Sequence, residues 1–422
     1  MKINLQKYSE YKDSGVEWLD KIPNHWDSVR MKHLFKDVSV KKMGDTELLS
    51  VTQDQGVVPR SWVENRMVMP SGALESFKFI NKGDFAISLR SFEGGLEYCH
   101  HDGIISPAYT VLKAKRNFES QFYKYLFKSF SFISELQTSV VGIRQGKNIS
   151  FEELSYSYLP IPPKEEQTAI ANFLDRKTAL IDQAVDIKQK QIELLKERRQ
   201  ILIHKAVTRG LNPNTKLKDS GVEWIGQIPE HWEVKKLKYV ASLISVKMAS
   251  KGSALSYIGM ENIESWTGRF ISTEAENEGL ASYFIEGDIL FGKLRPYLAK
   301  VYLAKGEGIC STEFLVYRAK ELVRNWYLNL LMQSFEFIKL IDSSTYGSKM
   351  PRANSDFIGN QLIPIPPKQE QVGILEYIET ATAKIAAAIS LKEQEIEKLK
   401  EYKSTLINSA VTGKIKISNY AK

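Results

Sequence analysis

Cysteine is nearly absent from this sequence, whose 422 residues include only Cys99 and Cys310. Two thiols cannot form a disulfide framework, so we expect the protein to occupy a reducing cytoplasm. Long apolar runs are lacking too. No stretch approaches the roughly 18 consecutive apolar residues of a membrane-spanning helix, and the N-terminal residues do not follow the pattern of a signal peptide. We therefore expect a soluble, cytoplasmic protein that is not exported and has no membrane partner.

Motifs for catalysis and cofactor binding are also lacking. An adenine methyltransferase needs an Asn/Asp-Pro-Pro-aromatic motif for the extruded base and a Gly-rich turn for its cofactor. The nearest approach is the linker turn Asn212-Pro213-Asn214-Thr215. The G-x-x-x-x-G-K-[ST] pattern that cradles phosphate is absent, so ATP use is not supported. The sequence therefore predicts no catalytic residue and no cofactor.

Clusters of metal-ligating residues are scarce. The only dense one is Cys99-His100-His101-Asp102, which has no partner cluster elsewhere in the chain. We interpret it as a polar turn rather than a zinc site. His25 and His231 each stand beside a Trp without a second ligand at metal spacing, which favours structural histidines. We expect no metal.

A modest excess of basic residues is present, with 58 Lys and Arg against 50 Asp and Glu. The resulting net charge of +8 and the pI near 9.0 favour binding to polyanionic partners. Many basic proteins bind no polyanion, so the charge alone decides little.

The longest regular pattern runs from Lys164 to Arg209, a segment without Gly or Pro. The Pro-rich segment 159–163 precedes it and favours an extended backbone. Apolar residues recur in a 4-3-4-3 rhythm: Leu174, Ile181, Val185, Ile192, Leu195, Leu202 and Ala206. This spacing predicts a helix with a coiled-coil seam. About 40 helical residues would span roughly 60 Å, and so long a single-stripe helix needs a partner.

The partner is a second copy of the same pattern. The Pro-rich segment recurs at 363–367, 204 residues later, and the seam recurs with it: Ile378, Thr382, Ile385, Ile389, Lys392, Ile396, Leu399, Lys403, Leu406 and Ala410. Even the imperfect seam positions match, Thr178 with Thr382 and Lys188 with Lys392. Residues 13–26 likewise recur as residues 219–232. The chain is therefore an internal duplication.

Each repeat also contains a module of mixed composition. Residues 28–116 and 236–318 are predicted to be β-rich, and residues 118–139 and 321–342 are each predicted to form one aromatic helix. The predicted fold class is α+β, with two β-rich globular domains, a pseudo-twofold repeat and two long antiparallel helices in a coiled coil. The predicted segments are 1–158 and 210–362 for the modules, and 159–209 and 363–422 for the Pro-rich segments with their helices. The module interiors have drifted apart, which indicates two different specificities on one architecture.

The duplicated motifs carry a family resemblance. LPIPPKEEQ and IPIPPKQEQ, each before a long helix, and the SGVEW…IP.HW segments before the modules resemble the conserved regions of type I restriction-modification specificity subunits. The resemblance covers essentially the whole chain. It implies two target recognition domains, each reading one half of a bipartite double-stranded DNA site. It also implies that the helices act as a spacer and dock two methyltransferase subunits, and that methylation, ATP-driven translocation and cleavage belong to the methyltransferase and restriction subunits.

Candidate DNA-facing residues were chosen as Lys and Arg, which neutralise phosphates, and as Arg and amide side chains, which read base edges. Several lie in the Gly-flanked basic loop 141–149 of the first module or in the loop 346–354 that stands in its place in the second. In the first module they are Arg90, Arg144, Gln145, Lys147 and Asn148, with Gln53 and Gln55 as weaker choices; in the second they are Lys293, Arg295, Lys349, Arg352 and Asn354. Charged residues of the first long helix are expected to form a solvated face: Asp182, Asp186, Lys188, Lys190, Glu193, Glu197, Arg198 and Arg199.

Two alternatives remain open. A stand-alone DNA methyltransferase would bind its cofactor as an isolated chain, which we do not expect. A coiled-coil scaffold unrelated to DNA would show absent or salt-insensitive DNA binding in the assembled complex. It would also leave the two diverged modules without an explanation.

Overall fold

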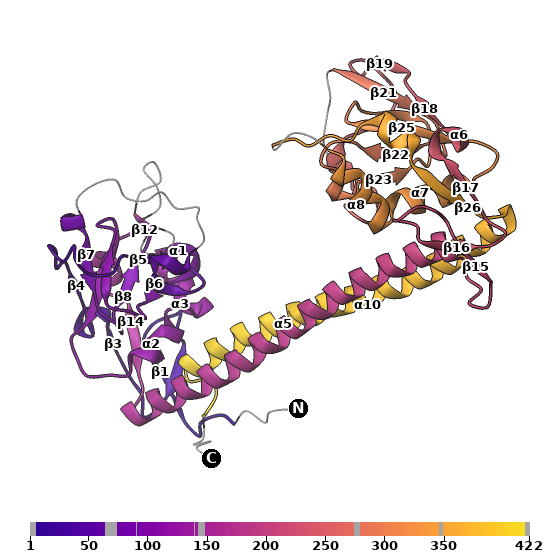
Figure 1. Cartoon of the computed structure of the whole chain (residues 1–422). Helices are drawn as coiled ribbons and strands as arrows, with labels where there is room; N and C mark the ends of the chain where they lie inside the picture. Colours follow the sequence, from indigo (N-terminus) through magenta and orange to yellow (C-terminus); the bar gives the residue numbers. More distant parts are fainter. Residues whose placement is uncertain are drawn as a thin grey trace. The chain divides into compact units, whose positions relative to one another are not determined.

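The computed structural model describes residues 6–63, 74–89, 91–138, 140–141, 148–273, 279–345 and 349–417. The chain forms two compact units (Figure 1). The first contains residues 1–188 and 394–422, and the second contains residues 189–393. Each unit therefore takes one β-rich module together with one half of each long helix.

The first unit is rich in short strands. These are β1 Tyr11–Asp13, β2 Lys21–Pro23, β3 Asp27–Arg30, β4 Phe35–Val38, β5 Leu49–Thr52, β6 Gly56–Pro59, β7 Lys78–Ile80, β8 Phe85–Ile87, β9 Glu97–Tyr98, β10 Gly103–Ile105, β11 Thr110–Ala114, β12 Val140–Val141, β13 Asn148–Ile149 and β14 Tyr158–Ile161. Its helices are α1 Ser91–Gly94, α2 Ser120–Leu126, α3 Phe130–Thr138, α4 Phe151–Leu154, η1 Met31–His33, η2 Arg60–Trp62, η3 Leu74–Ser76 and the start of α5 Lys164–Arg209.

The second unit repeats this order. Its strands are β15 Leu217–Asp219, β16 Gln227–Pro229, β17 Glu233–Lys236, β18 Ala241–Ile244, β19 Lys247–Ala249, β20 Tyr257–Ile258, β21 Leu280–Phe284, β22 Ile289–Gly292, β23 Val301–Leu303, β24 Gly308–Ser311, β25 Phe314–Ala319 and β26 Leu362–Ile365. Its helices are α6 Leu237–Val240, α7 Asn325–Gln333, α8 Phe335–Ser343, α9 Ser355–Asn360, η4 Met260–Asn262, η5 Pro296–Leu298 and the start of α10 Lys368–Val411.

One four-stranded sheet is common to both units. It has the order β4-β11-β8-β9 in the first unit and β18-β25-β22-β23 in the second. The second unit forms another four-stranded sheet, β19-β21-β24-β20. In the first unit the pair β10-β7 corresponds to β24-β21, and a parallel bridge between Leu48 and Ile104 corresponds to the pairing of β20 with β24. The hairpin β5-β6 of the first unit has no counterpart among the described strands of the second, so the strand pairing of the two modules differs there.

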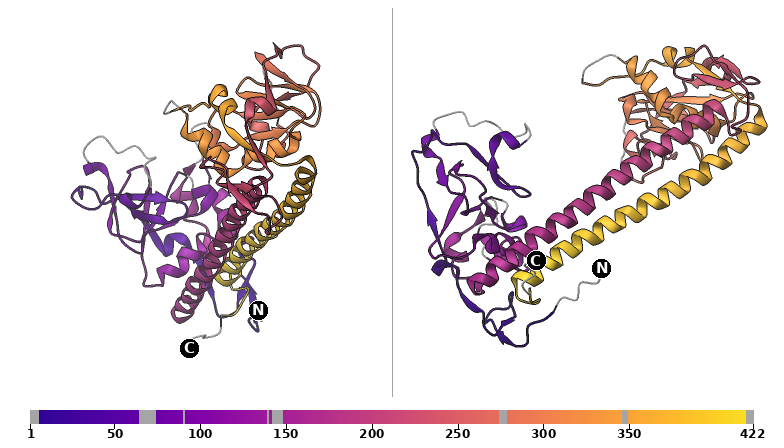
Figure 2. Two further views of the ribbon diagram at one scale, coloured as in Figure 1. Left: turned by 45° about the vertical axis from the view of Figure 1, so that its right-hand side comes forward. Right: turned by 60° about the horizontal axis from the view of Figure 1, so that its bottom comes forward.

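The two long helices lie side by side (Figure 1 and both views of Figure 2). In the first unit Lys188 Nζ lies 2.5 Å from Glu395 Oε2, and Lys403 Nζ lies 2.6 Å from Asp182 Oδ2. Residue numbers rise along one helix as they fall along the other, so the helices are antiparallel. In the second unit the end of α5 and the beginning of α10 share one buried apolar cluster. The predicted bounds of the first helix, Lys164 to Arg209, are confirmed. No helix in the described part of the chain is both long and apolar enough to cross a membrane.

Each Pro-rich segment is the extended strand that was expected. β14 pairs antiparallel with β3, and β26 pairs antiparallel with β17. Leu159 and Ile363, on these strands, are fully buried. The Pro-rich segments thus belong to the core of each unit and connect it directly to a long helix.

A repeated clamp fixes the beginning of each long helix. Trp26 Nε1 donates to Glu166 Oε2 at 3.1 Å, and His25 Nε2 lies 2.8 Å from the same oxygen. In the second unit Trp232 Nε1 donates to Glu370 Oε2 at 3.0 Å, and the ring nitrogen of His231 lies 2.5 Å from Glu370 Oε1. Both Trp side chains are fully buried. The two histidines therefore have structural roles beside a carboxylate, as the sequence analysis expected.

The glutamine after each clamp glutamate holds the aromatic helices in place. Gln167 Nε2 donates to the Pro162 carbonyl at 2.8 Å, and Gln167 Oε1 accepts from the Glu119 backbone N–H at 2.9 Å. Gln371 makes the equivalent bonds, accepting from the Arg324 N–H at 2.7 Å. The repeated glutamate and glutamine of the Pro-Pro-Lys-x-Glu-Gln motif are thus explained by their hydrogen bonds at the junction between module and helix.

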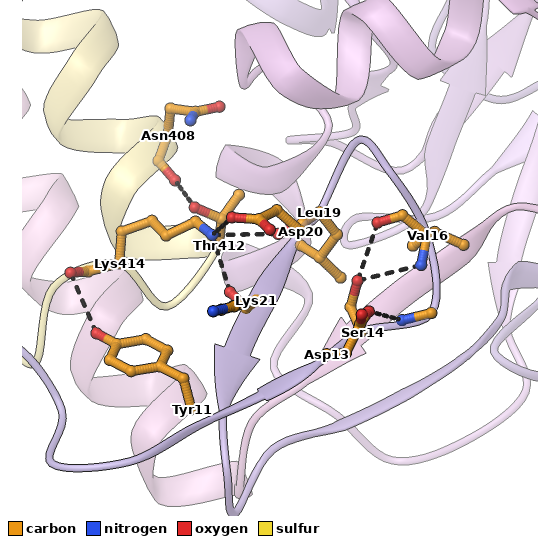
Figure 3. A network of polar contacts seen from close by, with 11 residues as sticks. Tyr11, Asp13, Ser14, Val16, Leu19, Asp20, Lys21, Asn408, Thr412 and Lys414 are labelled. Atoms are coloured by element: carbon orange, nitrogen blue, oxygen red, sulfur yellow. Dashed lines mark hydrogen bonds and ion pairs between the residues drawn. The ribbon is translucent and has the colours of Figure 1, made fainter.

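The residues directly after α10 pack on the N-terminal segment that contains Asp20 and Lys21 (Figure 3). Lys414 Nζ lies 3.1 Å from Asp20 Oδ2 and donates to the Lys21 carbonyl at 2.9 Å. This lysine holds the pKa of the Asp20 carboxyl below its usual range. Gly413 has φ +72°, and an added Cβ would lie only 2.3 Å from Pro23 Cδ. The first unit is therefore closed by residues from the two ends of its sequence.

Each predicted aromatic helix is in fact two helices, α2 with α3 and α7 with α8. The prediction of single helices over 118–139 and 321–342 was wrong. A serine interrupts each one: Ser129 Oγ donates to the Leu126 carbonyl at 2.7 Å, and Ser334, with ψ 144°, donates to the Leu331 carbonyl at 2.7 Å. Serine satisfies backbone groups at helix ends, which favours a break there. The expectation that the aromatic residues form core is confirmed for Phe122, Tyr123, Phe132, Tyr327 and Phe337.

Candidate nucleic-acid interface

Two loops of the second unit that are far apart in sequence pair to form a ledge, defined as residues 293–297 and 349–354. The Arg295 N–H donates to the Pro351 carbonyl at 2.8 Å, and the Ala353 N–H donates to the Lys293 carbonyl at 2.8 Å. Leu294 and Arg352 form an antiparallel bridge between these bonds. The ledge brings together all five candidates of this module, namely Lys293, Arg295, Lys349, Arg352 and Asn354.

Arg295 has an unusual backbone within the ledge. Its φ of +51° and ψ of 64° place it in the left-handed region, directly before η5. A non-glycine residue there carries a strain of about 1–2 kcal/mol, and such residues cluster at functional sites. The Arg295 side chain is exposed. The strained turn thus presents a guanidinium at the surface of the ledge.

Arg352 is paired within its own chain. Its Nε donates to Glu313 Oε2 at 3.1 Å and its Nη2 donates to Glu313 Oε1 at 3.0 Å, which makes the pair bidentate. The hydrogen bonds to Glu313 raise the pKa of the Arg352 guanidinium. The Lys293 N–H also donates to the Glu313 carbonyl at 2.9 Å. Glu313 therefore stabilises both loops of the ledge and offsets one positive charge there.

Asn354 caps a helix. Its Oδ1 accepts from the N–H groups of Asp356 at 2.7 Å and Phe357 at 3.3 Å, at the beginning of α9. Ser150 stands 204 residues earlier and caps α4 in the same way, with its Oγ accepting from Glu153. The cap is thus part of the shared framework, and it gives Asn354 a structural role beside any contact with DNA.

We expect Asn354→Ala to lower the free energy of unfolding by about 1 kcal/mol, because the cap is lost. Asn354→Ser should leave the free energy of unfolding unchanged, since serine caps equally well at the matched position of the first unit. Chemical denaturation of both variants measures this. Equal destabilisation by alanine and serine would contradict the capping role. Weaker DNA binding by Asn354→Ser at unchanged stability would instead assign a base contact to the amide.

In the first unit the candidates Gln53 and Gln55 share the turn between β5 and β6. The Gln55 N–H donates to Thr52 Oγ1 at 3.1 Å, and the Gln55 side chain is exposed. The Gln53 carbonyl accepts from Lys128 Nζ at 3.0 Å. Lys128 Nζ also lies 2.7 Å from Glu97 Oε1, so the turn is fastened to a carboxylate that is 1 % exposed.

Glu97 makes the stability of this unit depend on pH. Burial raises the pKa of its carboxyl from 4.5 to about 7, and Lys128 opposes the rise. The folded chain therefore binds the carboxyl proton of Glu97 more tightly than the unfolded chain does. The resulting contribution to the free energy of unfolding is fully present below pH 4.5 and is lost as the pH rises through 7. The shift corresponds to about 3 kcal/mol. We expect the free energy of unfolding of Glu97→Gln to decline less between about pH 5 and 8 than that of the wild type. Denaturant unfolding at each pH measures this. An unchanged slope would contradict the role of Glu97.

Of the other candidates of the first module, Arg90, Arg144, Gln145 and Lys147 lie outside the described residues. Asn148 belongs to β13 and stands 204 residues before Arg352. The assignment of all of these residues to DNA contact stays a prediction.

The cations of the long helices are less uniformly solvated than expected. Lys188 pairs with Glu395, and Arg199 is half-buried and donates through Nη2 to the Trp266 carbonyl. Burial lowers the pKa of the Arg199 guanidinium. For Arg199 the prediction of a solvated residue was wrong, because the loop that carries Trp266 covers this part of α5.

No group of three or more metal-ligating residues occurs in the described ranges. Cys99 is buried, its Sγ lies 3.0 Å from the His101 carbonyl oxygen, and burial raises the pKa of the thiol to about 12. Asp102 instead accepts from the Lys82 N–H at 2.7 Å. These contacts agree with the interpretation of residues 99–102 as a turn rather than a zinc site.

Sequence reasoning missed exposed apolar residues near the candidates. Met350 and Tyr297 lie on the ledge, and Trp62 ends η2 beside His101, with ring centroids 5.0 Å apart. Charged and amide groups indicate contact with phosphates and base edges, and these apolar side chains carry neither. The position of Met350 between Lys349 and Pro351 was the available signal.

Comparisons with known proteins give consistent results. The model of a family described as type I restriction modification DNA specificity domain matches residues 25–197 and again residues 229–401. The chain is 25% identical to the type I restriction enzyme MjaVIII specificity subunit of Methanocaldococcus jannaschii, over 99% of both chains. It is 23% identical to the EcoDI specificity subunit of Escherichia coli, over 85% of this chain and 82% of that one.

Two solved structures share the fold. The first is a chain from a study of complex assembly and conformational transition of the type I R-M system, with a TM-score of 0.68 and 16% identity over 93% of this chain and 99% of that chain. The second is the HsdS subunit of Thermoanaerobacter tengcongensis, with a TM-score of 0.52 and 16% identity over 93% and 98%.

Proposed function

This chain belongs to the type I restriction-modification DNA specificity family, and from that premise we propose how its parts divide the work. The chain is the DNA sequence-specificity subunit of a type I restriction-modification complex. Each β-rich module reads one half of a bipartite double-stranded DNA target. The four segments 1–158, 159–209, 210–362 and 363–422 correspond to reader, spacer helix, reader and spacer helix.

The observation that carries the proposal is the contrast between framework and loops. The clamps Trp26–Glu166 and Trp232–Glu370 are repeated almost bond for bond. The β5-β6 hairpin of the first unit has no counterpart among the described strands of the second, where β20 pairs only with β24. A duplicated framework that presents different surfaces is what two different half-sites require.

The ledge of the second unit supports DNA binding there. Lys293, Arg295 and Lys349 gather on it, and cations of this kind neutralise phosphates or reach guanine edges. Binding should therefore weaken steeply as the salt concentration rises. In the first unit the corresponding role falls to Gln53, Gln55, Arg90, Asn148 and residues 144–147.

The partners in this proposal are two methyltransferase subunits and, in the full complex, restriction subunits. Methylation, ATP hydrolysis and cleavage are their work, and this chain contributes recognition and assembly. Support comes from α5, on which four large aliphatic side chains recur at intervals of seven and are exposed: Leu180, Ile187, Leu194 and Ile201. A stripe with this period lies on one face of a helix and fits a helix of a partner.

The test is to map the bases methylated by the complex of this chain with its methyltransferase subunits. We expect methylated bases within two different short sequences at one fixed separation. Modification within a single contiguous site would overturn the bipartite reading. Binding of the methyl-donor cofactor by the isolated chain would favour a stand-alone methyltransferase. Absent or salt-insensitive DNA binding by the complex would favour a scaffold unrelated to DNA.

A further inference from the structure

Two apolar side chains stand among the cations of the ledge. Met350 is 52% exposed and Tyr297 is 45% exposed. Single exposed apolar residues are ordinary on protein surfaces. Here, however, both belong to the same paired loops as Arg295 and Lys349, whose side chains are also exposed. An apolar group in that setting suits a ligand that is charged at its edge and apolar within.

The backbone directly after Met350 is fixed by hydrogen bonds. Pro351, the next residue, accepts a hydrogen bond from Arg295, and Ala353 donates to Lys293. The bidentate pair of Arg352 with Glu313 ties the same loop to the turn between β24 and β25. Met350 is therefore joined directly to a segment that is held in place, although its own side chain is flexible. A residue held in this way can discriminate between ligands, since misplacement costs affinity.

Duplex DNA offers such a ligand. The major groove admits a two-stranded ribbon, and the antiparallel bridge between Leu294 and Arg352 makes the ledge a short ribbon. The phosphates at the groove edges match Arg295 and Lys349. Within the groove, the C5 methyl of thymine is the one apolar group that a base pair presents.

We propose that Met350 contacts the C5 methyl of a thymine in the half-site read by the second module, and so helps to determine its specificity. This inference rests on the proposed function. Met350 reads a base that the cationic residues cannot recognise, because a methyl group neither accepts nor donates a hydrogen bond. Tyr297 and the cations supply the surrounding surface.

The experiment replaces each thymine of that half-site in turn by deoxyuridine, which removes only the methyl group. Binding of each duplex to the complex with methyltransferase subunits is then measured. For the wild-type chain we expect one position at which binding weakens about fourfold, the loss for one methyl removed from an apolar contact. With Met350→Ala, thymine and deoxyuridine at that position should bind equally. Met350→Leu should restore the preference for thymine.

Leu280→Ala is the matched control, because Leu280 is also an exposed aliphatic residue of the second unit but lies on β21. It should bind as the wild type and keep the preference for thymine. The inference is overturned if Met350→Ala keeps the full preference, or if no thymine of the half-site is sensitive to loss of its methyl. It is also overturned if the apolar residues kink the DNA without such sensitivity, as inserted wedges do. A wild-type complex that shows no sequence-specific binding would instead refute the proposed function itself.

Discussion

A chain that lacks one heptad from each long helix should direct methylation to a target whose spacer is about three base pairs shorter, with both half-sites unchanged. Seven helical residues span about 10 Å, and duplex DNA rises ~3.4 Å per base pair. The deletions are centred on Gln189 in α5 and Glu393 in α10, at the boundaries of the two compact units. They remove Lys188 together with its partner Glu395. The seam continues in register because its period is seven.

The effect on the original target should be a nearly complete loss of modification, which sequencing of methylated bases measures directly. Removing two residues from each helix is the control. At about 100° per residue it turns the two halves of each seam by roughly 200°, so that they face apart, and it should abolish modification at every spacing. Continued modification of the original target after the paired heptad deletion would refute the role of the helices as a spacer.

The second large effect concerns stability. We expect Trp232→Ala to lower the free energy of unfolding by about 3–5 kcal/mol, the range for loss of a fully buried Trp. Trp232 is 0 % exposed and donates to Glu370 at 3.0 Å. It also lies against the end of α5, where a Cβ added to Gly210 would be 3.2 Å from Trp232 Cζ2. One side chain therefore joins the module to the end of one long helix and the beginning of the other.

Chemical denaturation of the whole chain measures this loss. Trp232→Phe is the informative comparison, because it keeps most of the apolar contact but removes the donor to Glu370. We expect it to lower the free energy of unfolding by about 1–3 kcal/mol, the range for loss of one hydrogen bond to a charged acceptor, since Glu370 is partly exposed and keeps its contact with His231. Trp26→Ala should destabilise the first unit in the same way, through the loss of its bond to Glu166. A loss below about 1 kcal/mol for Trp232→Ala would show that the clamp is not what holds the helix to its module.

The framework was predictable from the sequence because it is repeated and periodic. The first long helix begins and ends at the predicted residues, Lys164 and Arg209. The range 28–116, predicted to be β-rich, contains the strands β4 to β11. The aromatic helices were predicted too long, because their apolar pattern continues through Ser129 and Ser334 while the backbone does not.

The candidate site was predictable only as a set of residue types. Nothing in the sequence shows that Arg352 binds Glu313, or that Asn354 caps α9. Met350 was overlooked for the same reason, since its exposure depends on how the loop is held. Loops have no period, so the sequence indicates which side chains are present in them and not which way they lie.

By itself, the sequence determined that the chain is two copies of one architecture, that each copy has a long helix with a heptad seam, and that no motif for catalysis accompanies them. These features follow from local patterns, and a local pattern can be read without the rest of the chain. The tertiary structure decided that residues 293–295 meet residues 351–353 to form one cationic ledge. Some 50 residues of sheet and helix intervene between these loops, and their meeting is set by how that intervening structure packs.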